Sequence, residues 1–483
     1  MDLKPFHLPC VIFALAVAGA VVLSGCEGDR GPAGPAGPGL AESEVTYLGG
    51  NGGPCRHCHA RIVGTVANCK HTDAFADLGV ADRANLYCVQ CHTTGFDSEV
   101  QFGDTLIEPG AYGPDTYGYD DYVGVPTAEA AERRAMLAGV QCESCHGPLG
   151  PAFNDHSPRL TLATGIEGDT SVSLCAPCHR SQLEEWLDSG HGTVSGIDLA
   201  AFNEEFGHSP CFSCHTSEGF VKNQDPAFAT REFDEYNFIG CPTCHDPHAG
   251  EADGGNIYQI RTLSPVEVVY APGYTPGDPG IPRMEGYDTG QLCARCHHGR
   301  RDAANVAGQI ERGTQHFGPH GSPQMDTYIG AGCYEIPDYD YDRVAAHQGI
   351  INACVYCHMV REVEEGGTLQ DHAFHTFEPD VGNCEPCHSL TDFNFHNIQT
   401  IVAEKMDEIA SLLGYADTEA FFQEGTGWDS RAPGVQVWQR EVAYAMVFVH
   451  ADGSRGVHNP EYVIDLLDNA IDYAERNLGL AGR

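Results

Sequence analysis

The chain has 483 residues, including 57 glycines and 29 prolines, and only 9% of its residues are aromatic. That length usually corresponds to two or three domains, but this composition offers little material for ordinary hydrophobic cores of that size. The charge is strongly acidic, with 26 basic against 68 acidic residues and a net charge of −42. Such a surface repels nucleic acids and anionic lipid headgroups and favours cations or basic proteins. Nucleic-acid binding is therefore excluded.

The N-terminal segment has the pattern of an export signal. Lys4 gives a weakly positive start, and residues 11–23 are almost wholly apolar but too short to span a bilayer comfortably. The segment ends LSGC, which resembles the lipobox of bacterial lipoproteins. That resemblance implies a signal peptide over residues 1–25 and lipidation of Cys26. Glu27 stands where the inner-membrane retention signal would be Asp, which points to the outer membrane. The alternative is an ordinary secretion signal with an incidental Cys26.

A short collagen-like repeat follows the signal. Residues 28–39 read GDRGPAGPAGPG, which is four Gly-X-Y triplets. Four triplets are too few for a stable triple helix. We therefore expect residues 26–44 to be a stiff spacer between anchor and body, with trimerisation as the alternative.

Eighteen of the 22 cysteines fall into nine copies of C-x-x-C-H. This is the c-type haem attachment pattern, in which two thiols bond to the haem and the adjacent histidine binds its iron. Zinc sites would need paired C-x-x-C units without a histidine after each, and redox dithiols do not come nine to a chain. We therefore predict nine covalently attached haem c groups. The predicted attachment residues are Cys55, Cys58, Cys88, Cys91, Cys142, Cys145, Cys175, Cys178, Cys211, Cys214, Cys241, Cys244, Cys293, Cys296, Cys354, Cys357, Cys384 and Cys387. The predicted proximal ligands are His59, His92, His146, His179, His215, His245, His297, His358 and His388.

With an export signal in front of these motifs, the chain resembles the bacterial multihaem c-type cytochromes. The resemblance implies a fold of mostly irregular loops and short helices wrapped around a chain of haems. The haems would themselves form much of the interior, and folding would depend on their attachment.

A c-type iron needs a second axial ligand or keeps an open face. Seven methionines cannot close nine irons, but histidines beyond the motifs can. CESCHGP before His156, CPTCHDPH with His248, and EEWLDSGHG with His191 resemble distal-ligand segments of relatives of hydroxylamine oxidoreductase and octaheme tetrathionate reductase. DGSRGVHNP with His458 resembles the last ligand segment of that group and of pentahaem nitrite reductase. The nine candidate distal ligands are His71, His156, His191, His208, His248, His320, His347, His375 and His458.

Several histidine assignments stay open at this stage. His316 competes with His320, and His372 competes with His375, because each pair lies in one segment. A surface or hydrogen-bonding role is the alternative for each candidate. No role is assigned to His57, His298, His396 and His450.

Motif spacing and hydrophobic patterning suggest three parts after the spacer. Residues 45–285 carry six motifs, residues 286–396 carry three, and a turn-rich stretch around residues 249–290 separates them. Residues 397–483 form a C-terminal region with three amphipathic helical patterns, at 398–413, 435–446 and 463–471. These helices would cover the last haems, or alternatively form a dimer interface.

Two smaller features have more than one interpretation. Residues 111–125 are rich in Tyr, Asp and Gly and are a candidate calcium loop, but an acidic surface loop is the favoured interpretation. Cys69 and Cys333 remain after the motifs, signal and anchor are assigned, and a disulfide between them is compatible with export. The alternative for Cys69 is a tenth haem held by one thioether.

The combined expectation is electron transfer by a nine-haem, mainly bis-histidine cytochrome anchored at the outer membrane. It would relay electrons between the periplasm and an outer or extracellular acceptor, with other redox proteins or metal cations as partners and no catalytic side chains. The alternatives are a multihaem reductase of a small nitrogen or sulfur oxyanion, and a subunit of a cytochrome filament. A reductase would need one iron with an open face.

Overall fold

The computed structural model describes residues 45–53, 55–96, 100–102, 105–107, 116–148, 172, 174–192, 211–224, 236–249, 258–365, 368–389 and 392–480. In these ranges short helices and irregular segments prevail, and strands occur only in two-stranded sheets. The predicted fold class is confirmed. The calls on the signal peptide, Cys26 and the collagen-like spacer concern residues outside the described ranges.

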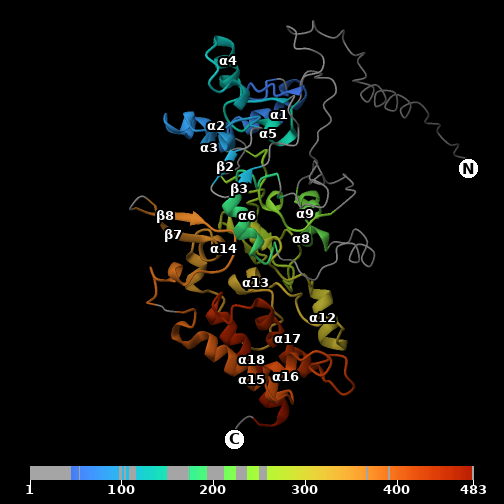
Figure 1. Cartoon of the computed structure of the whole chain (residues 1–483). Helices are drawn as coiled ribbons and strands as arrows, with labels where there is room; N and C mark the ends of the chain where they lie inside the picture. The colour runs from blue at the N-terminus through green and yellow to red at the C-terminus, as the bar shows by residue number, and fades with distance from the viewer. Residues whose placement is uncertain are drawn as a thin grey trace, which may run out of the picture.

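The first helices lie at one end of the molecule, and the last four lie at the opposite end (Figure 1). The N-terminal group is α1 (Arg56–Val66), α2 (Lys70–Asp77), α3 (Leu86–His92), α4 (Ala128–Met136) and α5 (Cys142–His146). The middle of the chain contains α6 (Arg180–Leu187), α8 (Phe212–His215), α9 (Ser217–Gln224), α10 (Cys241–Cys244), α11 (Gly290–Ala294), α12 (Ala303–Arg312), α13 (Gln324–Tyr328) and α14 (Cys354–His358). The C-terminal group is α15 (Ile398–Leu412), α16 (Thr418–Phe422), α17 (Val437–Asp452) and α18 (Pro460–Leu478).

The strands form four small sheets. The parallel pair is β1 (Val45–Thr46) with β4 (Thr116–Tyr117). The antiparallel pairs are β2 (Val100–Phe102) with β3 (Thr105–Ile107), β5 (Val266–Glu267) with β6 (Arg283–Met284), and β7 (Val360–Glu365) with β8 (Thr368–Ala373). β2–β3 and β7–β8 are local hairpins, whereas β1–β4 joins segments far apart in the sequence, and none of these two-stranded sheets forms a layer of the fold.

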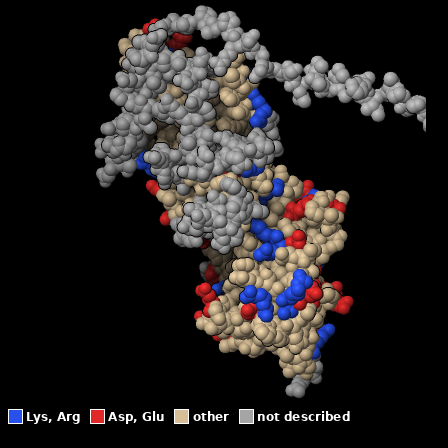
Figure 2. Space-filling view, turned by 90° about the vertical axis from the view of Figure 1, so that its right-hand side faces the viewer, with Lys and Arg blue, Asp and Glu red and all other residues tan. Residues whose placement is uncertain are grey.

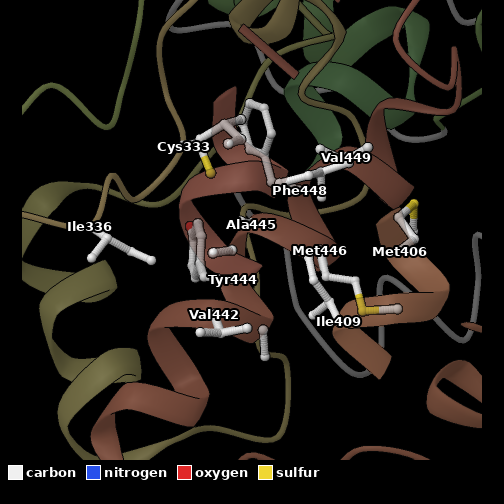
Figure 3. Packing of buried hydrophobic residues seen from close by; sticks show 14 of the residues in the cluster. Cys333, Ile336, Met406, Ile409, Val442, Tyr444, Ala445, Met446, Phe448 and Val449 are labelled. Carbon is white, nitrogen blue, oxygen red and sulfur yellow. The ribbon is translucent and has the colours of Figure 1, made fainter. Parts of the chain in front are cut away.

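The C-terminal helices α15, α17 and α18 pack into the largest hydrophobic cluster of the described residues (Figure 3). They occupy the three stretches in which helical periodicity was predicted, and the short α16 adds Phe421 to the same cluster. Asn459 caps α18 by accepting a hydrogen bond from the backbone of Tyr462 at 3.1 Å, and Pro460 fits the first turn because its missing N–H would have no helical partner. Leu467 in α18 is fully buried, and truncating such a leucine to alanine typically costs about 2–5 kcal/mol.

The two cysteines outside the motifs are far apart in the fold. Cys333 is buried in the C-terminal cluster beside Tyr444 and Phe448 (Figure 3). Cys69 is buried between α1 and α2, where its sulfur lies 3.8 Å from the Thr72 hydroxyl. Both are free thiols, so the suggested disulfide between them is wrong. Each is enclosed by its own packing at a different end of the molecule.

The face shown in Figure 2 mixes Lys and Arg with Asp and Glu over the described part of the chain, although the whole chain is strongly acidic. No helix among the described residues is long and apolar enough to cross a membrane.

Candidate functional site

The C-x-x-C-H motifs share one local conformation. In six of them the histidine N–H donates to the carbonyl oxygen of the first cysteine, which is one turn of helix. These bonds join His59 to Cys55 at 2.9 Å, His179 to Cys175 at 2.9 Å, His215 to Cys211 at 3.1 Å, His245 to Cys241 at 2.9 Å, His297 to Cys293 at 2.9 Å and His388 to Cys384 at 2.8 Å. Because a helical turn places residues three apart on one face, both thiols point the same way and the histidine follows directly. This is the geometry that the spacing is expected to give.

Seven proximal histidines face a histidine from elsewhere in the chain. In every pair the partner is one of the nine candidate distal ligands. The pairs, with the distances between ring centroids, are His179 with His71 (6.0 Å), His146 with His248 (6.0 Å), His297 with His191 (6.2 Å), His215 with His320 (6.4 Å), His245 with His375 (6.3 Å), His388 with His347 (6.1 Å) and His358 with His458 (6.3 Å). Each candidate site is named below after its proximal histidine.

This separation fits one iron between two imidazoles. Bonds from a first-row metal to a histidine nitrogen are about 2.0 Å long, which places the centroids of two opposed ring ligands about 6.3 Å apart. Stacked rings in direct contact are closer, as His450 is to Phe422 with centroids 3.8 Å apart, whereas the stacked pair His146 and His248 is 6.0 Å apart. No group of three or more His, Cys, Asp or Glu side chains that could hold a metal ion occurs in the described ranges. A two-histidine centre completed by a haem is therefore the arrangement that these residues suit.

The second ring nitrogen of several ligand candidates is already engaged. Nδ1 contacts a backbone carbonyl in His92 (Ala74, 2.5 Å), His245 (Tyr258, 2.8 Å), His347 (Val457, 2.8 Å) and His358 (Phe377, 2.9 Å). If Nδ1 carries the proton in these contacts, Nε2 is left as the lone-pair nitrogen that a metal needs. Burial lowers the pKa of His191 to about 4, which keeps that ring neutral at physiological pH, as ligation requires.

Half-buried arginines beside two of these sites also suit a haem. Arg295, Arg300 and Arg301 lie in and just after the seventh motif. Each has a buried side-chain N–H without a hydrogen-bond acceptor in the described part of the chain. Buried donors are normally satisfied, and a haem carries two propionate carboxylates that arginine binds well. The sequence analysis could have identified these arginines, because three arginines within seven residues are conspicuous among only 26 basic residues.

Four ligand candidates fall outside the seven pairs. His59 and His92 are in the described ranges, whereas His156 and His208 lie outside them. Two choices between neighbouring histidines were left open, His316 or His320 and His372 or His375. The ring of His320 faces the motif histidine His215, and the ring of His375 faces the motif histidine His245. The side chain of His372 is outside what the structure describes.

The unassigned histidines have other neighbours. Nδ1 of His298 lies 2.6 Å from the carbonyl oxygen of Gly299. The ring of His396 packs on Phe395 with centroids 4.0 Å apart, and His450 stacks on Phe422. His57 is exposed. Residues 111–115 of the candidate calcium loop lie outside the described ranges.

Cysteine side chains from different motifs lie close together. These contacts indicate which sites are neighbours in space. Five pairs are in side-chain contact, namely Cys55 with Cys142, Cys91 with Cys178, Cys175 with Cys241, Cys214 with Cys296, and Cys293 with Cys354. Cys145 lies close enough to interact electrostatically with Cys175, and so do Cys244 with Cys293 and Cys357 with Cys384. The order of neighbouring sites, each named after its motif histidine, is therefore His59, His146, His179, His245, His297, His358 and His388. The His92 site lies beside the His179 site, and the His215 site lies beside the His297 site.

Hydrogen bonds support parts of this order independently of the thiols. The backbone of Asn51, just before the first motif, donates to Gln141 Oε1 at 2.7 Å. Near the other end, Asn383 Nδ2 donates to the carbonyl oxygen of Tyr356 at 2.9 Å. The ligand pairs also join residues on both sides of position 285. The division into six-haem and three-haem regions therefore stays a prediction about motif spacing.

Comparisons with known proteins found similarity to two cytochrome families and to a multiheme cytochrome. A family model described as cytochrome c552 matches residues 333–480, and one described as cytochrome c554 and c-prime matches residues 108–147 and 174–246. The chain is 25% identical over 134 residues to the multiheme cytochrome MtrA of Shewanella baltica (strain OS185), a match that covers 25% of this chain and 39% of that protein. The chain thus spans about two fifths of the length of this curated relative.

Two solved structures align with most of the chain at low identity. The outer cell wall cytochrome OcwA gives a TM-score of 0.46 at 15% identity, covering 89% of this chain and 99% of that one. The undecaheme cytochrome from the S-layer of Carboxydothermus ferrireducens gives a TM-score of 0.46 at 16% identity, covering 92% of this chain and 70% of that one.

Proposed function

Because the chain is a multihaem c-type cytochrome, we propose that it transfers electrons along nine haem sites whose irons are closed on both faces by histidine. The observation that carries the proposal is the set of seven opposed histidine pairs, each combining a motif histidine with a predicted distal ligand. The remaining motif histidines, His59 and His92, would take His156 and His208, in either order. When bound, the haem supplies a one-electron iron couple.

The arrangement of the chain favours a relay over a reductase. A reductase of nitrogen or sulfur oxyanions needs an iron with an open face and cationic groups around it. At the seven paired sites the two opposed imidazoles would occupy both faces of the iron. The contacts between attachment loops connect successive sites from the His59 end to the His388 end. Electron transfer along such a series requires no substrate pocket.

The proposed location rests on the N-terminal sequence. A signal peptide over residues 1–25, lipidation of Cys26 and the spacer over residues 26–44 would tether the body to the outer membrane, on its periplasmic side or at the cell surface. Leu48, near the start of the described body, donates its backbone N–H to Glu143 at 2.8 Å. The tether would therefore hold the end that carries the His59 and His146 sites, leaving the His388 end for a redox partner or an extracellular acceptor.

The test combines mass and spin state. The intact mass of the mature holoprotein should exceed that of the lipidated polypeptide by nine haem masses. Electron paramagnetic resonance of the oxidised protein should show only low-spin iron, and the reduced protein should bind carbon monoxide poorly. Eight or ten haems would show that a motif or Cys69 was misread. A native high-spin haem that turns over nitrite or hydroxylamine at about 1 per second or faster, an ordinary enzymatic rate, would overturn the relay.

A further inference from the structure

The C-terminal end of α17 lies against ligand candidates of two neighbouring sites. Asp452, the last residue of α17, has a fully buried side chain whose Oδ1 accepts a hydrogen bond from Nδ1 of His458 at 2.7 Å. Its Oδ2 accepts from both the hydroxyl and the backbone N–H of Ser454. On the other side, Gln324 donates through Nε2 to the carbonyl oxygens of Ala451 at 3.3 Å and Asp452 at 3.2 Å. Its Oε1 lies 3.4 Å from Nδ1 of His297.

The partner of His458 differs in charge from those of the other ligand candidates. The contacts to Nδ1 of His92, His245, His347 and His358 come from neutral backbone carbonyls, and that to His297 from a neutral amide. Two further carboxylates approach ligand candidates, Asp246 at 3.9 Å from His248 and Glu185 at 3.8 Å from His375. Both distances are beyond hydrogen-bond range. Asp246 and Glu185 instead accept hydrogen bonds from the backbone N–H groups of His248 and His375, at 3.0 and 2.8 Å. Asp452 differs from them because it bonds to the ring nitrogen of a ligand candidate.

A carboxylate on the outer nitrogen of a metal-bound histidine makes the ring a more basic ligand. A more basic ligand stabilises the oxidised iron over the reduced one and so lowers the reduction potential. The effect is strong here because the side chain of Asp452 is shielded from water, where charges interact over a low dielectric. The C-terminus of α17 adds the partial negative charge of a helix end at the same place.

We propose that Asp452 is a positioning residue that orients His458 and lowers the reduction potential of the haem at the His358 site below that of its neighbour at the His297 site. The inference rests on the proposed ligand pair His358 and His458. The His358 site lies between the His297 and His388 sites. A low reduction potential there makes electron transfer from the His297 site to the His358 site energetically unfavourable. Asp452 thereby sets the rate of exchange between the last site and the rest of the chain.

The test is Asp452→Asn, which removes the charge but keeps a group of the same shape that can still accept the bond from His458. A spectroscopic redox titration should show one haem's share of the absorbance change moving to higher potential, with haem content and low-spin signals unchanged. Ser454→Ala is the matched control. It removes a donor to Oδ2 and the acceptor of the His458 backbone N–H (3.2 Å), but leaves the carboxylate on the His458 ring, so its titration should follow the wild type closely.

Gln324→Glu is the reciprocal variant, in case Asp452→Asn fails to fold. It places a carboxylate beside His297 and should move a different single haem to lower potential. The proposal is overturned if either folded variant, with its full complement of haems, titrates like the wild type. The ligand pair is tested separately by His458→Ala. If that variant leaves every haem low-spin, the assignment of His458 is wrong, and with it this part of the proposed function.

Discussion

The rings of His71 and His179 face each other with centroids 6.0 Å apart and planes at 75°. His71 stands in α2, two residues after Cys69, in a segment that only weakly resembles a distal-ligand pattern. His179 ends the CAPCH motif and lies far along the chain. The backbone N–H of Val140, just before the third motif, donates to the carbonyl oxygen of His71 at 2.9 Å and so ties α2 to that segment.

Replacing His71 with alanine should open the His179 site. The variant should gain one high-spin signal and bind carbon monoxide at a single haem, because the iron there would keep only its proximal ligand. Electron paramagnetic resonance and carbon monoxide titration of the reduced protein measure both effects. His57→Ala is the control, since this exposed residue lies inside the first motif and faces none of the seven sites. A His71→Ala protein that stays entirely low-spin would remove His71 from the ligand set.

Sequence reasoning reached the candidate ligands because haem attachment fixes spacing. C-x-x-C-H must lie within one helical turn, so the motif is legible without any knowledge of the fold. The distal partners are harder, because His375 meets His245 only after the chain has wound through several other sites. The segments that carry distal candidates could be recognised, but which iron each one serves depends on loop paths that no local pattern encodes.

The residues that contact the ligand candidates from behind, Asp452 and Gln324, were not predicted from the sequence. Asp452 lies in a stretch that reads simply as the end of an amphipathic helix, and Gln324 is the first residue of the short helix α13. Their importance comes from contact with His458 and His297, which the tertiary structure alone creates. The C-terminal helices, in contrast, were predictable, because their apolar residues recur with helical period over several turns.

The anchor at Cys26 is tested by Cys26→Ala. If lipidation at this residue holds the protein, the variant should move from the membrane fraction to the soluble fraction with its haem content unchanged. Fractionation followed by haem staining measures this. Cys10→Ala is the matched control, because Cys10 lies in the segment expected to be removed. Continued sedimentation of the Cys26→Ala protein with the outer membrane would exclude the lipoprotein assignment.

Asp326 should make stability depend on pH. Its side chain is fully buried, and burial raises the pKa of its carboxyl to about 7, well above the ordinary value of 3.8. Between about pH 4 and pH 7 the folded protein therefore holds a proton that the unfolded chain has lost, so the free energy of unfolding falls as pH rises. The slope approaches about 1.4 kcal/mol per pH unit. Asp326→Asn, which cannot ionise, should flatten this dependence in thermal unfolding followed from pH 4 to pH 8. An unchanged slope would show that Asp326 is not the group responsible.

The order of the attachment loops predicts that the sites are not equivalent for transfer along the molecule. The His245 site lies in the series between the His179 and His297 sites, because Cys241 contacts Cys175 and Cys244 lies near Cys293. The His215 site lies beside the series, where Cys214 contacts Cys296.

Serine cannot form the thioether bonds, so replacing both cysteines of one motif should remove one haem and leave a gap at that site. With the lipid-anchored protein in a monolayer, conductance between the support and a conducting tip should fall steeply for Cys241→Ser with Cys244→Ser, because electron tunnelling weakens sharply with distance. Cys211→Ser with Cys214→Ser should conduct like the wild type. Both variants must hold eight haems by intact mass, which makes them matched in cofactor loss. If the two lose conductance equally, the His215 site belongs to the main series, and the order inferred from the thiol contacts is wrong.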